Sequence, residues 1–275
     1  MDTRETYSII LAKQDGLQDR TRIMQVFREY TRINPDISEV AAKHSAGFIA
    51  EKISREEVFA VGKICMNNNV EIFIVTDAST AVLPKADNCR YISCLSEEFG
   101  YSLDGTAKNI IEWSDVAVVC AGIIEEEKVT TTKHKEGPSA AQKLGSMAIT
   151  MTTGLPIPLG RAKEVTKKVM ETIVTNYLEL IIYPPAPGQT PLRLKMNQDN
   201  IDYSYLAARR EYSSPGNFRL VLEDIDKYAV KALRNHVFYS IIKKEPASLS
   251  RYEDYRYLEK ELRWLMTLRQ MKNKE

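Results

Sequence analysis

The sequence predicts an α+β protein made of two folded parts, and three observations support this class. In residues 1–77, short apolar runs bounded by turn residues are joined by segments with helical periodicity. After residue 90, strand-like runs predominate, and residues 109–122 form the most apolar of them. A long amphipathic helix is then predicted from Ser214, and a terminal helix is predicted from Ser250.

Residues 1–77 are predicted to form a strand, three helices and a closing strand. The first strand is Tyr7–Lys13 and the closing strand is Val70–Val75, both rich in β-branched and apolar residues. Asn34-Pro35 ends the first helix, because proline has no amide hydrogen and restricts the residue before it. The third helix begins at the capping box Ser54-Arg55-Glu56-Glu57. Its spacing predicts that four residues face inward: Val58, Val61, Gly62 and Cys65.

Residues 91–240 are predicted to form a small β-barrel or sheet that is capped by a long helix, after a linker at residues 78–90. Val116–Ala121 is continuously apolar, as a buried strand would be. The long helix takes Ser214 as its cap and Pro215 as its first helical residue. Its predicted apolar face holds Phe218, Val221, Leu222, Ile225, Ala229, Ala232 and Leu233.

The chain ends in a predicted helical segment, residues 241–275. Its helix starts at a second capping box, Ser250-Arg251-Tyr252-Glu253. The helix carries Trp264, several leucines and several basic residues, and docking onto its own domain is favoured over binding a membrane or a partner. His236 is placed at the end of the preceding long helix, where a cation suits the helix dipole.

A long insertion is predicted at residues 126–168, where the sequence changes character. It holds eight basic and four acidic residues, which leaves a net charge of +4, and it is interrupted by glycines and prolines. A loop of this length in a compact domain is usually functional or disordered. The candidate interaction residues here are Lys133, His134, Lys135, Arg161 and Lys163. For His134, which lies between two lysines, the functional interpretation is contact with an anion, and a solvated loop is the favoured alternative.

A second group of candidate interaction residues is Arg209 and Arg210, which lie among Tyr203, Tyr205 and Tyr212. Aromatic and basic residues together can stack bases and hold phosphates. The alternative is a strand rim along which the arginines extend to solvent. Nucleic acid is not favoured as a partner, because the formal net charge of the whole chain is only +1.

The sequence contains no catalytic signature, and no cofactor or metal is predicted. Cys89 and Cys94 are spaced as C-x4-C, but a zinc site needs a second pair of ligands, and the three histidines are far apart in sequence. The motifs G-x-S-x-G, H-E-x-x-H and G-x-x-x-x-G-K do not occur. A pocket in which a carboxylate, a histidine and a hydroxyl converge would favour an enzyme, but a sequence cannot show such convergence.

The expected location is the cytoplasm. The first residues, MDTRET, have neither the basic nor the apolar region of a secretory signal, and no run approaches the roughly 20 apolar residues of a membrane span. The four cysteines lie in ordinary globular sequence, and three of them have apolar surroundings, as expected of free thiols in a reducing compartment.

Residues 7–76 resemble the C-terminal domain of the large-subunit ribosomal stalk protein and the related fold of the Clp protease adaptor. The resemblance rests on Val26–Thr31, on Ile53–Glu57 and on the helix and strand that follow. It implies the fold but not translation-factor binding. The stalk domain has a Gly-Leu-Gly-Leu-Lys segment where this chain has Ile33–Ile37, and the adaptor's Asn-Asp-Asp peptide-binding entry has no counterpart.

The later part resembles the pleckstrin-homology superfamily, in its lipid-associated GRAM branch. Ile111–Val116, a following strand and hairpin, and the long helix carry this resemblance, from which the insertion at residues 126–168 departs. The two-part arrangement as a whole resembles bacterial proteins rather than any enzyme family. The leading hypothesis is a non-enzymatic cytoplasmic adaptor that binds another protein. The alternatives are a reader of anionic lipid or phosphoinositide and an enzyme without familiar motifs.

Overall fold

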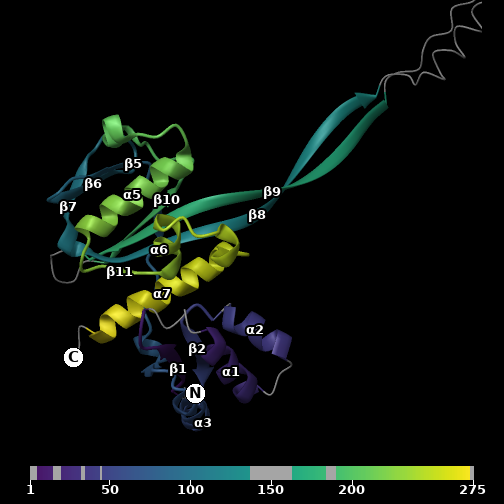
Figure 1. Ribbon diagram of the computed structural model, residues 1–275, viewed down its shortest axis with the longest axis vertical. Helices are drawn as coiled ribbons and strands as arrows, with labels where there is room; N and C mark the ends of the chain where they lie inside the picture. The colour runs from purple at the N-terminus through teal and green to yellow at the C-terminus, as the bar shows by residue number, and fades with distance from the viewer. Residues whose placement is uncertain are drawn as a thin grey trace, which may run out of the picture. The chain divides into compact units, whose positions relative to one another are not determined.

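The computed structural model describes residues 5–14, 20–31, 35–43, 45–136, 163–183 and 190–272. Helices and sheets both make up large parts of it, so the predicted α+β class is confirmed (Figure 1). The chain divides into two compact units, Met1–Glu125 with Val174–Glu275, and Glu126–Ile173. None of the helices in the described ranges has the length and apolarity needed to cross a bilayer.

The N-terminal part of the first unit has a three-stranded antiparallel sheet in the order β2-β1-β3. The predicted helices and outer strands are present, and the structure adds β2, a strand that was not predicted between the second and third helices. The elements are β1 (Tyr7–Leu11), α1 (Arg20–Thr31), α2 (Pro35–Lys43), β2 (Phe48–Ile53), α3 (Arg55–Asn67) and β3 (Ile72–Thr76).

The predicted capping box of α3 is confirmed. The Ser54 hydroxyl accepts a hydrogen bond from the Glu57 backbone N–H, and the Glu57 carboxylate accepts one from the Ser54 N–H at 2.8 Å. Of the residues predicted to face inward, Val58, Val61 and Cys65 are buried. The prediction is wrong for Gly62, because a Cβ built on it would meet no atom within 4 Å.

The larger sheet is built on two long strands, β8 (Val116–Glu136) and β9 (Lys163–Ile182). Its order is β11-β8-β9-β10-β4, and β12 also pairs with β8. β9 and β10 pair in antiparallel orientation. β4 pairs with β10 in parallel, and β11 and β12 each pair with β8 in parallel. The shorter strands are β4 (Ala86–Asn88), β10 (Leu192–Asn197), β11 (Leu233–Arg234) and β12 (Arg251–Tyr252).

Along residues 116–124 both faces of this sheet are covered, which explains the continuous apolar run in β8. Val118 and Cys120 belong to one hydrophobic core, and Val119 and Ala121 belong to another. Successive side chains of a strand point to opposite faces, so a strand buried on both faces has no polar alternation. The described strands form three sheets, and the third is a small antiparallel sheet of β5 (Tyr91–Cys94), β6 (Glu98–Ser102) and β7 (Asn109–Glu112).

The long helix is α5 (Ser214–Tyr228), and its predicted apolar face is buried. Its N-cap is Ser213, one residue earlier than predicted, and this side chain accepts from the Gly216 N–H. The helix also ends earlier than predicted. His236 is the first residue of a further helix, α6 (His236–Ile242), for which Asn235 is the N-cap. The predicted capping of a helix C-terminus by His236 is therefore wrong.

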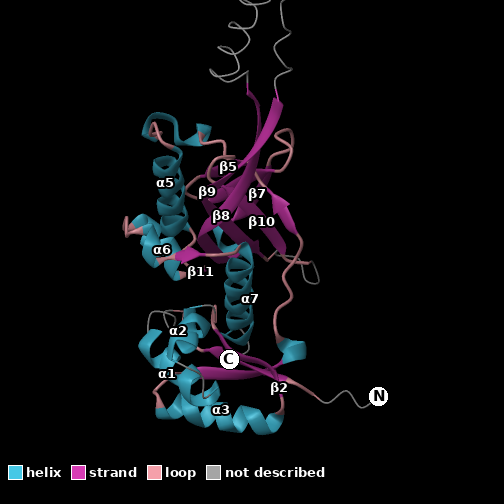
Figure 2. Cartoon of the chain, turned by 90° about the vertical axis from the view of Figure 1, so that its right-hand side faces the viewer, coloured by secondary structure: helices cyan, strands magenta, loops and turns pink. Residues whose placement is uncertain are grey.

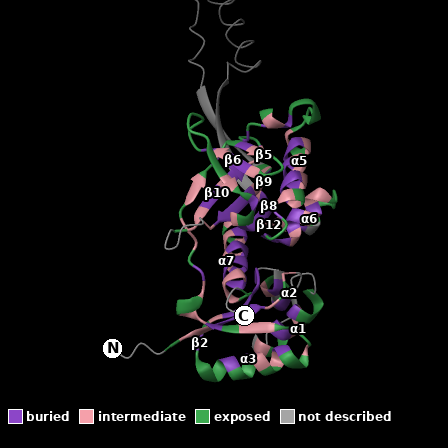
Figure 3. Cartoon of the chain, turned by 90° about the vertical axis from the view of Figure 1, so that its left-hand side faces the viewer, coloured by how far each residue is buried: buried purple, intermediate pink, exposed green. Residues whose placement is uncertain are grey.

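The last helix, α7 (Tyr255–Lys272), is packed between the three-stranded sheet and the larger sheet (Figure 2). The indole N–H of Trp264, a residue of this helix, donates to the Leu11 carbonyl at 3.0 Å. The Trp264 ring lies over Gly47, whose φ is +87°. Figure 3 shows many of its residues buried. The predicted docking of this helix within the chain is confirmed.

The predicted capping box at residues 250–253 is wrong, because Arg251–Tyr252 is the strand β12. The helix starts instead after Asp254, whose carboxylate accepts from the Arg256 N–H at 2.7 Å. The segment predicted to be a linker, residues 78–90, is packed: the Ala81 N–H donates to the Thr267 hydroxyl, and β4 joins the larger sheet.

Part of the predicted insertion is regular strand, since β8 continues to Glu136 and β9 begins at Lys163. Residues 137–162 lie outside the described residues. Short 3₁₀ turns complete the described elements: η2 (Asp77–Ser79), η3 (Trp113–Asp115), η4 (Ser204–Arg209) and η5 (Ala247–Leu249).

Candidate functional site

Four of the five candidate residues of the basic insertion lie on the two long strands. Lys133, His134 and Lys135 are on β8, and Lys163 is the first residue of β9, but the described structure does not extend to their side chains. Arg161 lies outside the described residues. Anion binding by this group therefore remains a prediction.

The arginine pair occupies the end of η4, where the two side chains have different surroundings. Arg209 is bound to Asp224 at 2.8 Å, and this hydrogen bond raises the pKa of the arginine. Arg210 is exposed. Among the neighbouring tyrosines, Tyr203 is buried and donates to the Gln198 carbonyl, so its ring cannot stack on a base. The geometry gives Arg209 a structural role.

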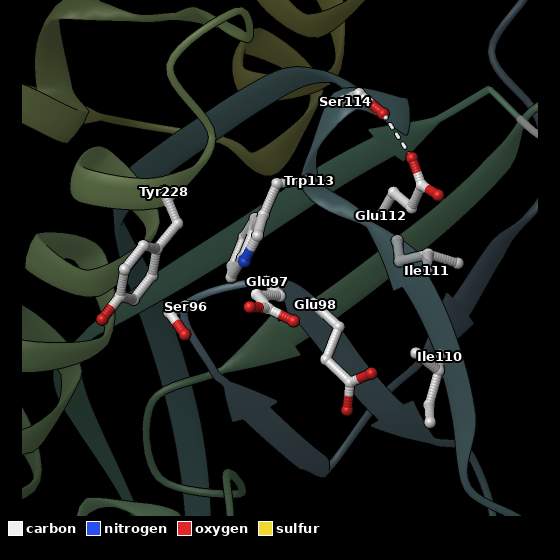
Figure 4. A pocket seen from close by; sticks show the side chains of 9 residues that line it. All are labelled: Ser96, Glu97, Glu98, Ile110, Ile111, Glu112, Trp113, Ser114 and Tyr228. Atoms are coloured by element: carbon white, nitrogen blue, oxygen red, sulfur yellow. Dashed lines mark hydrogen bonds between the residues drawn. The ribbon is translucent and has the colours of Figure 1, made fainter.

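A hollow of about 570 Å³ lies beside Trp113, the tryptophan at the centre of the most apolar run (Figure 4). The turn η3 fixes this side chain, whose indole N–H donates to the Leu95 carbonyl at 2.8 Å. Its ring packs 5.4 Å from the Phe99 ring and 5.7 Å from the Tyr228 ring, measured between centroids. The remaining walls are Ser96, Glu97, Glu98, Ile110, Ile111, Glu112 and Ser114.

The hollow is acidic. Its walls contain Glu97, Glu98 and Glu112 and no lysine or arginine. Glu98 and Glu112 face each other directly across β6 and β7, and like charges in that position destabilise a sheet. Figure 4 shows the Glu112 carboxylate turned towards Ser114, whose hydroxyl donates to it at 3.2 Å.

The negative charge of Glu98 is partly offset from outside the hollow. Lys108 lies 3.9 Å from Glu98, but the two side chains are 55% and 35% exposed, and such pairs contribute little. Lys227, which precedes Tyr228 in the chain and is not among the residues lining the hollow, lies 4.9 Å from the centroid of the Tyr228 ring. Aromatic rings such as those of Trp113 and Tyr228 can attract an ammonium group over their faces. A cation entering the hollow would relieve the repulsion and contact the aromatic wall. The site is therefore suited to an organic cation.

A carboxylate, a histidine and a hydroxyl also converge, but in the interior of the first unit. The Tyr252 hydroxyl donates to Glu261, and the His236 Nδ1 lies 3.8 Å from the other carboxylate oxygen. Burial raises the pKa of Tyr252 well above its ordinary value, so the hydroxyl stays protonated. Asn235 donates to the same hydroxyl and exchanges hydrogen bonds with the backbone of Ala121.

This convergence is the feature that would favour an enzyme, yet the geometry supports a structural role. Glu261 is buried on α7, Tyr252 is partly buried on β12, which pairs with β8, and neither residue lines the Trp113 hollow. Nδ1 and Nε2 of His236 and one oxygen of Glu261 are buried without a hydrogen-bond partner. The network joins α6, α7 and β12 to the sheet.

The cysteines show no sign of a reactive or metal-bound thiol. All four are free and buried, and burial raises the pKa of Cys65 and Cys89 to about 11. In the described ranges, no group of three or more His, Cys, Asp and Glu residues is placed to hold a metal ion. Thiolates are the reactive form of cysteine, so these side chains act as packing groups.

No family model, curated protein or solved structure matches the chain. The resemblances to the ribosomal stalk domain and to the pleckstrin-homology superfamily therefore remain predictions.

Proposed function

We propose that this chain is a non-enzymatic cytoplasmic adaptor that binds another protein, and that the hollow beside Trp113 receives a lysine or arginine side chain of that partner. The observation that carries the proposal is the opposed pair Glu98 and Glu112 at the mouth of an aromatic wall. A sheet that keeps two like charges face to face gains stability when a cation lies between them.

The surroundings support a side chain as the ligand rather than a metal ion. The walls combine carboxylates with Trp113 and Tyr228, and an alkylammonium or guanidinium group uses both kinds of contact. Anionic lipid is disfavoured at this place, since its headgroups would meet three glutamates. The cytoplasmic location is supported by four unpaired cysteines.

Titration of the full chain with a hexalysine peptide, followed by tryptophan fluorescence, tests the proposal. The pocket variant is Glu98→Gln with Glu112→Gln, and the matched control is Glu39→Gln with Glu56→Gln, two exposed residues outside the hollow. Both variants change the net charge by +2. We expect the pocket variant to bind roughly tenfold more weakly, because it loses two exposed ion pairs of up to about 1 kcal/mol each.

Thermal unfolding gives a second readout. The pocket variant should be at least as stable as the wild type without peptide, because the substitution removes the repulsion across β6 and β7. Equal loss of binding in the pocket variant and the control would show that only overall charge matters. Absence of hexalysine binding to the wild type at low salt would also refute the proposal.

A further inference from the structure

The small sheet has one covered edge and one open edge. At the β5 edge, Asp202 forms a bridge with Tyr91, and its backbone N–H donates to the Arg90 carbonyl at 2.8 Å. At the other edge, no further described strand pairs with the outer side of β7, which lies at the outside of this sheet in Figure 1. Alternate residues of β7 therefore direct their N–H and C=O groups away from β6, where another strand can pair with them.

The two faces of β7 have different surroundings. Ile111 lies opposite Phe99, which is fully buried, so this face of the strand belongs to the hydrophobic core. Ile110 and Glu112 lie on the other, outer face, because successive side chains of a strand alternate. Ile110 is 56% exposed, and it lines the Trp113 hollow together with Glu112.

Lys108, just before β7, continues this outer face. A Cβ built on Gly100, which lies opposite Ile110, would be 2.8 Å from the Lys108 Cε. The lysine therefore lies on the same face as Ile110 and Glu112. At every second residue along the open edge, the outer face thus presents a basic, then an apolar, then an acidic side chain. This order of charges specifies which strand is complementary to the edge.

We propose that β7 binds an extended segment of the partner protein as an added antiparallel strand, with the pattern Lys/Arg-x-apolar-x-Asp/Glu. The basic residue lies opposite Glu112, the apolar residue opposite Ile110 and the acidic residue opposite Lys108. Cross-strand pairs of these three kinds are favourable, and antiparallel pairing is slightly more stable than parallel pairing. Backbone hydrogen bonds to the edge supply affinity, and the alternate side chains supply specificity.

This inference rests on the proposed function, because the basic residue of the segment is the one whose side chain enters the Trp113 hollow. It adds the conformation of the partner and its sequence pattern. The pattern carries no net charge, so binding of such a segment depends on the order of its side chains and not on overall attraction to the glutamates.

Fluorescence anisotropy of the labelled peptide Thr-Lys-Thr-Ile-Thr-Glu-Thr, titrated with the full chain, tests the strand pairing. The matched control is the same peptide with N-methyl groups on its interior amides, which keeps every side chain but removes the hydrogens that pair with β7. We expect the unmodified heptapeptide to bind. N-methylation should weaken binding roughly tenfold or more, because at least two backbone hydrogen bonds are lost.

Substitution of Ile110 tests the register without changing a charge of the hollow. Ile110→Thr keeps a β-branched residue at an exposed strand position, and the matched control is Ile74→Thr, at the exposed middle residue of β3. We expect Ile110→Thr to bind the heptapeptide roughly two- to fivefold more weakly, and the control to bind it as the wild type does. Hexalysine has no apolar side chain to pair with Ile110, so both variants should bind it much as the wild type does.

Hydrogen exchange of the full chain locates the added strand. With the heptapeptide bound, the β7 amides that point away from β6 should exchange more slowly, whereas contact with side chains alone would leave their exchange unchanged. Suppose that hexalysine binds but the heptapeptide does not, or binds equally when N-methylated, or leaves β7 exchange unchanged. Any of these results would overturn the strand pairing and leave the proposed function standing. Absence of binding by both hexalysine and the heptapeptide would refute both.

Discussion

The two hydrophobic cores of the first unit differ in how far along the chain their parts come from. The core beneath α5 is assembled between Cys89 and Phe238, with its strands and its helix in one continuous half of the chain. The core of the β2-β1-β3 sheet brings together residues from Ile9 to Leu268. The first of these cores can form from neighbouring elements, whereas the second needs both ends of the chain.

The contacts of α7 show how the distant ends are joined. Trp264 covers Gly47 and binds the Leu11 carbonyl, while Lys260 and Arg263 both bind Glu51 of β2. The other side of α7 reaches the larger sheet, where Glu259 binds Arg193 at 2.8 Å. The last helix is thus part of the N-terminal fold and also a cover for the larger sheet.

The largest difference between the cores is expected from their tryptophans. Trp264→Ala should cost about 3–5 kcal/mol, because it empties the contact between α7 and the three-stranded sheet. Trp113→Ala should cost less, since that ring borders an open hollow. Urea unfolding measures both costs. Hydrogen exchange should show lost protection in β1–β3 for Trp264→Ala and in β5–β7 for Trp113→Ala. The same exchange pattern in both variants would mean that the two cores unfold as one.

The next effect concerns the polar contact between α7 and the larger sheet. Arg193 is buried and binds Glu179 at 2.5 and 2.9 Å. Arg193→Met should cost about 3 kcal/mol, because it leaves the carboxylate buried without its partner. Adding Glu179→Gln should recover much of that loss. A single variant as stable as the wild type would show that the ion pair is dispensable.

The sign of the pH effect in Arg193→Met follows from Glu179. Burial raises the pKa of this carboxyl, and Arg193 opposes the rise. Without the arginine, the folded-state pKa lies further above the unfolded value. The folded state then binds more protons, so the variant loses stability as pH rises. The deficit relative to the wild type should be larger at pH 8 than at pH 5 in urea unfolding.

Substitutions of two glycines are expected to change stability by smaller amounts and in opposite directions. Gly47→Ala should cost about 1–3 kcal/mol, because its Cβ would overlap the Trp264 ring and its φ is in the left-handed region. Gly62→Ala, on the exposed side of α3, should raise stability by up to about 1 kcal/mol. Thermal unfolding compares the two variants with the wild type. A destabilised Gly62→Ala variant would contradict the open space around this residue.

The smallest effect is expected at a turn of the small sheet. The Asp104 carboxylate accepts from the Thr106 N–H at 2.8 Å and from the Ala107 N–H at 3.2 Å, and these bonds lower its pKa well below the usual value. The stabilisation is present above the unfolded-state pKa of about 4 and is lost as pH falls through the folded-state value. The melting temperature of Asp104→Asn should be slightly below wild type at pH 7, and the difference should shrink towards pH 2.

Local signals in the sequence were sufficient for the elements whose neighbours are close in the chain. The capping box at Ser54 and the apolar face of α5 follow from nearby residues, and both are present. The strand β2 was missed because its Glu51 and Lys52 give it a polar sequence. Glu51 is held by Lys260 and Arg263, which come from the far end of the chain.

The candidate sites were predictable only in part for the same reason. Trp113 was prominent in the sequence, but the opposition of Glu98 and Glu112 depends on the register of β6 and β7. Tyr228 reaches the hollow from another helix. Gly62 has the periodicity of an inward-facing residue, and only the packing of α3 shows that it faces open space.

The contact between Trp264 and Gly47 has a consequence for synthesis of the protein. A ribosome completes β1–β3 early, but roughly 190 residues separate Thr76 from Trp264. At about 5–20 residues per second, the sheet face beneath α7 stays uncovered for roughly 10–40 s. During that interval the β1–β3 sheet of the nascent chain exposes apolar surface. We therefore expect chaperones that act at the ribosome to bind this part of the chain.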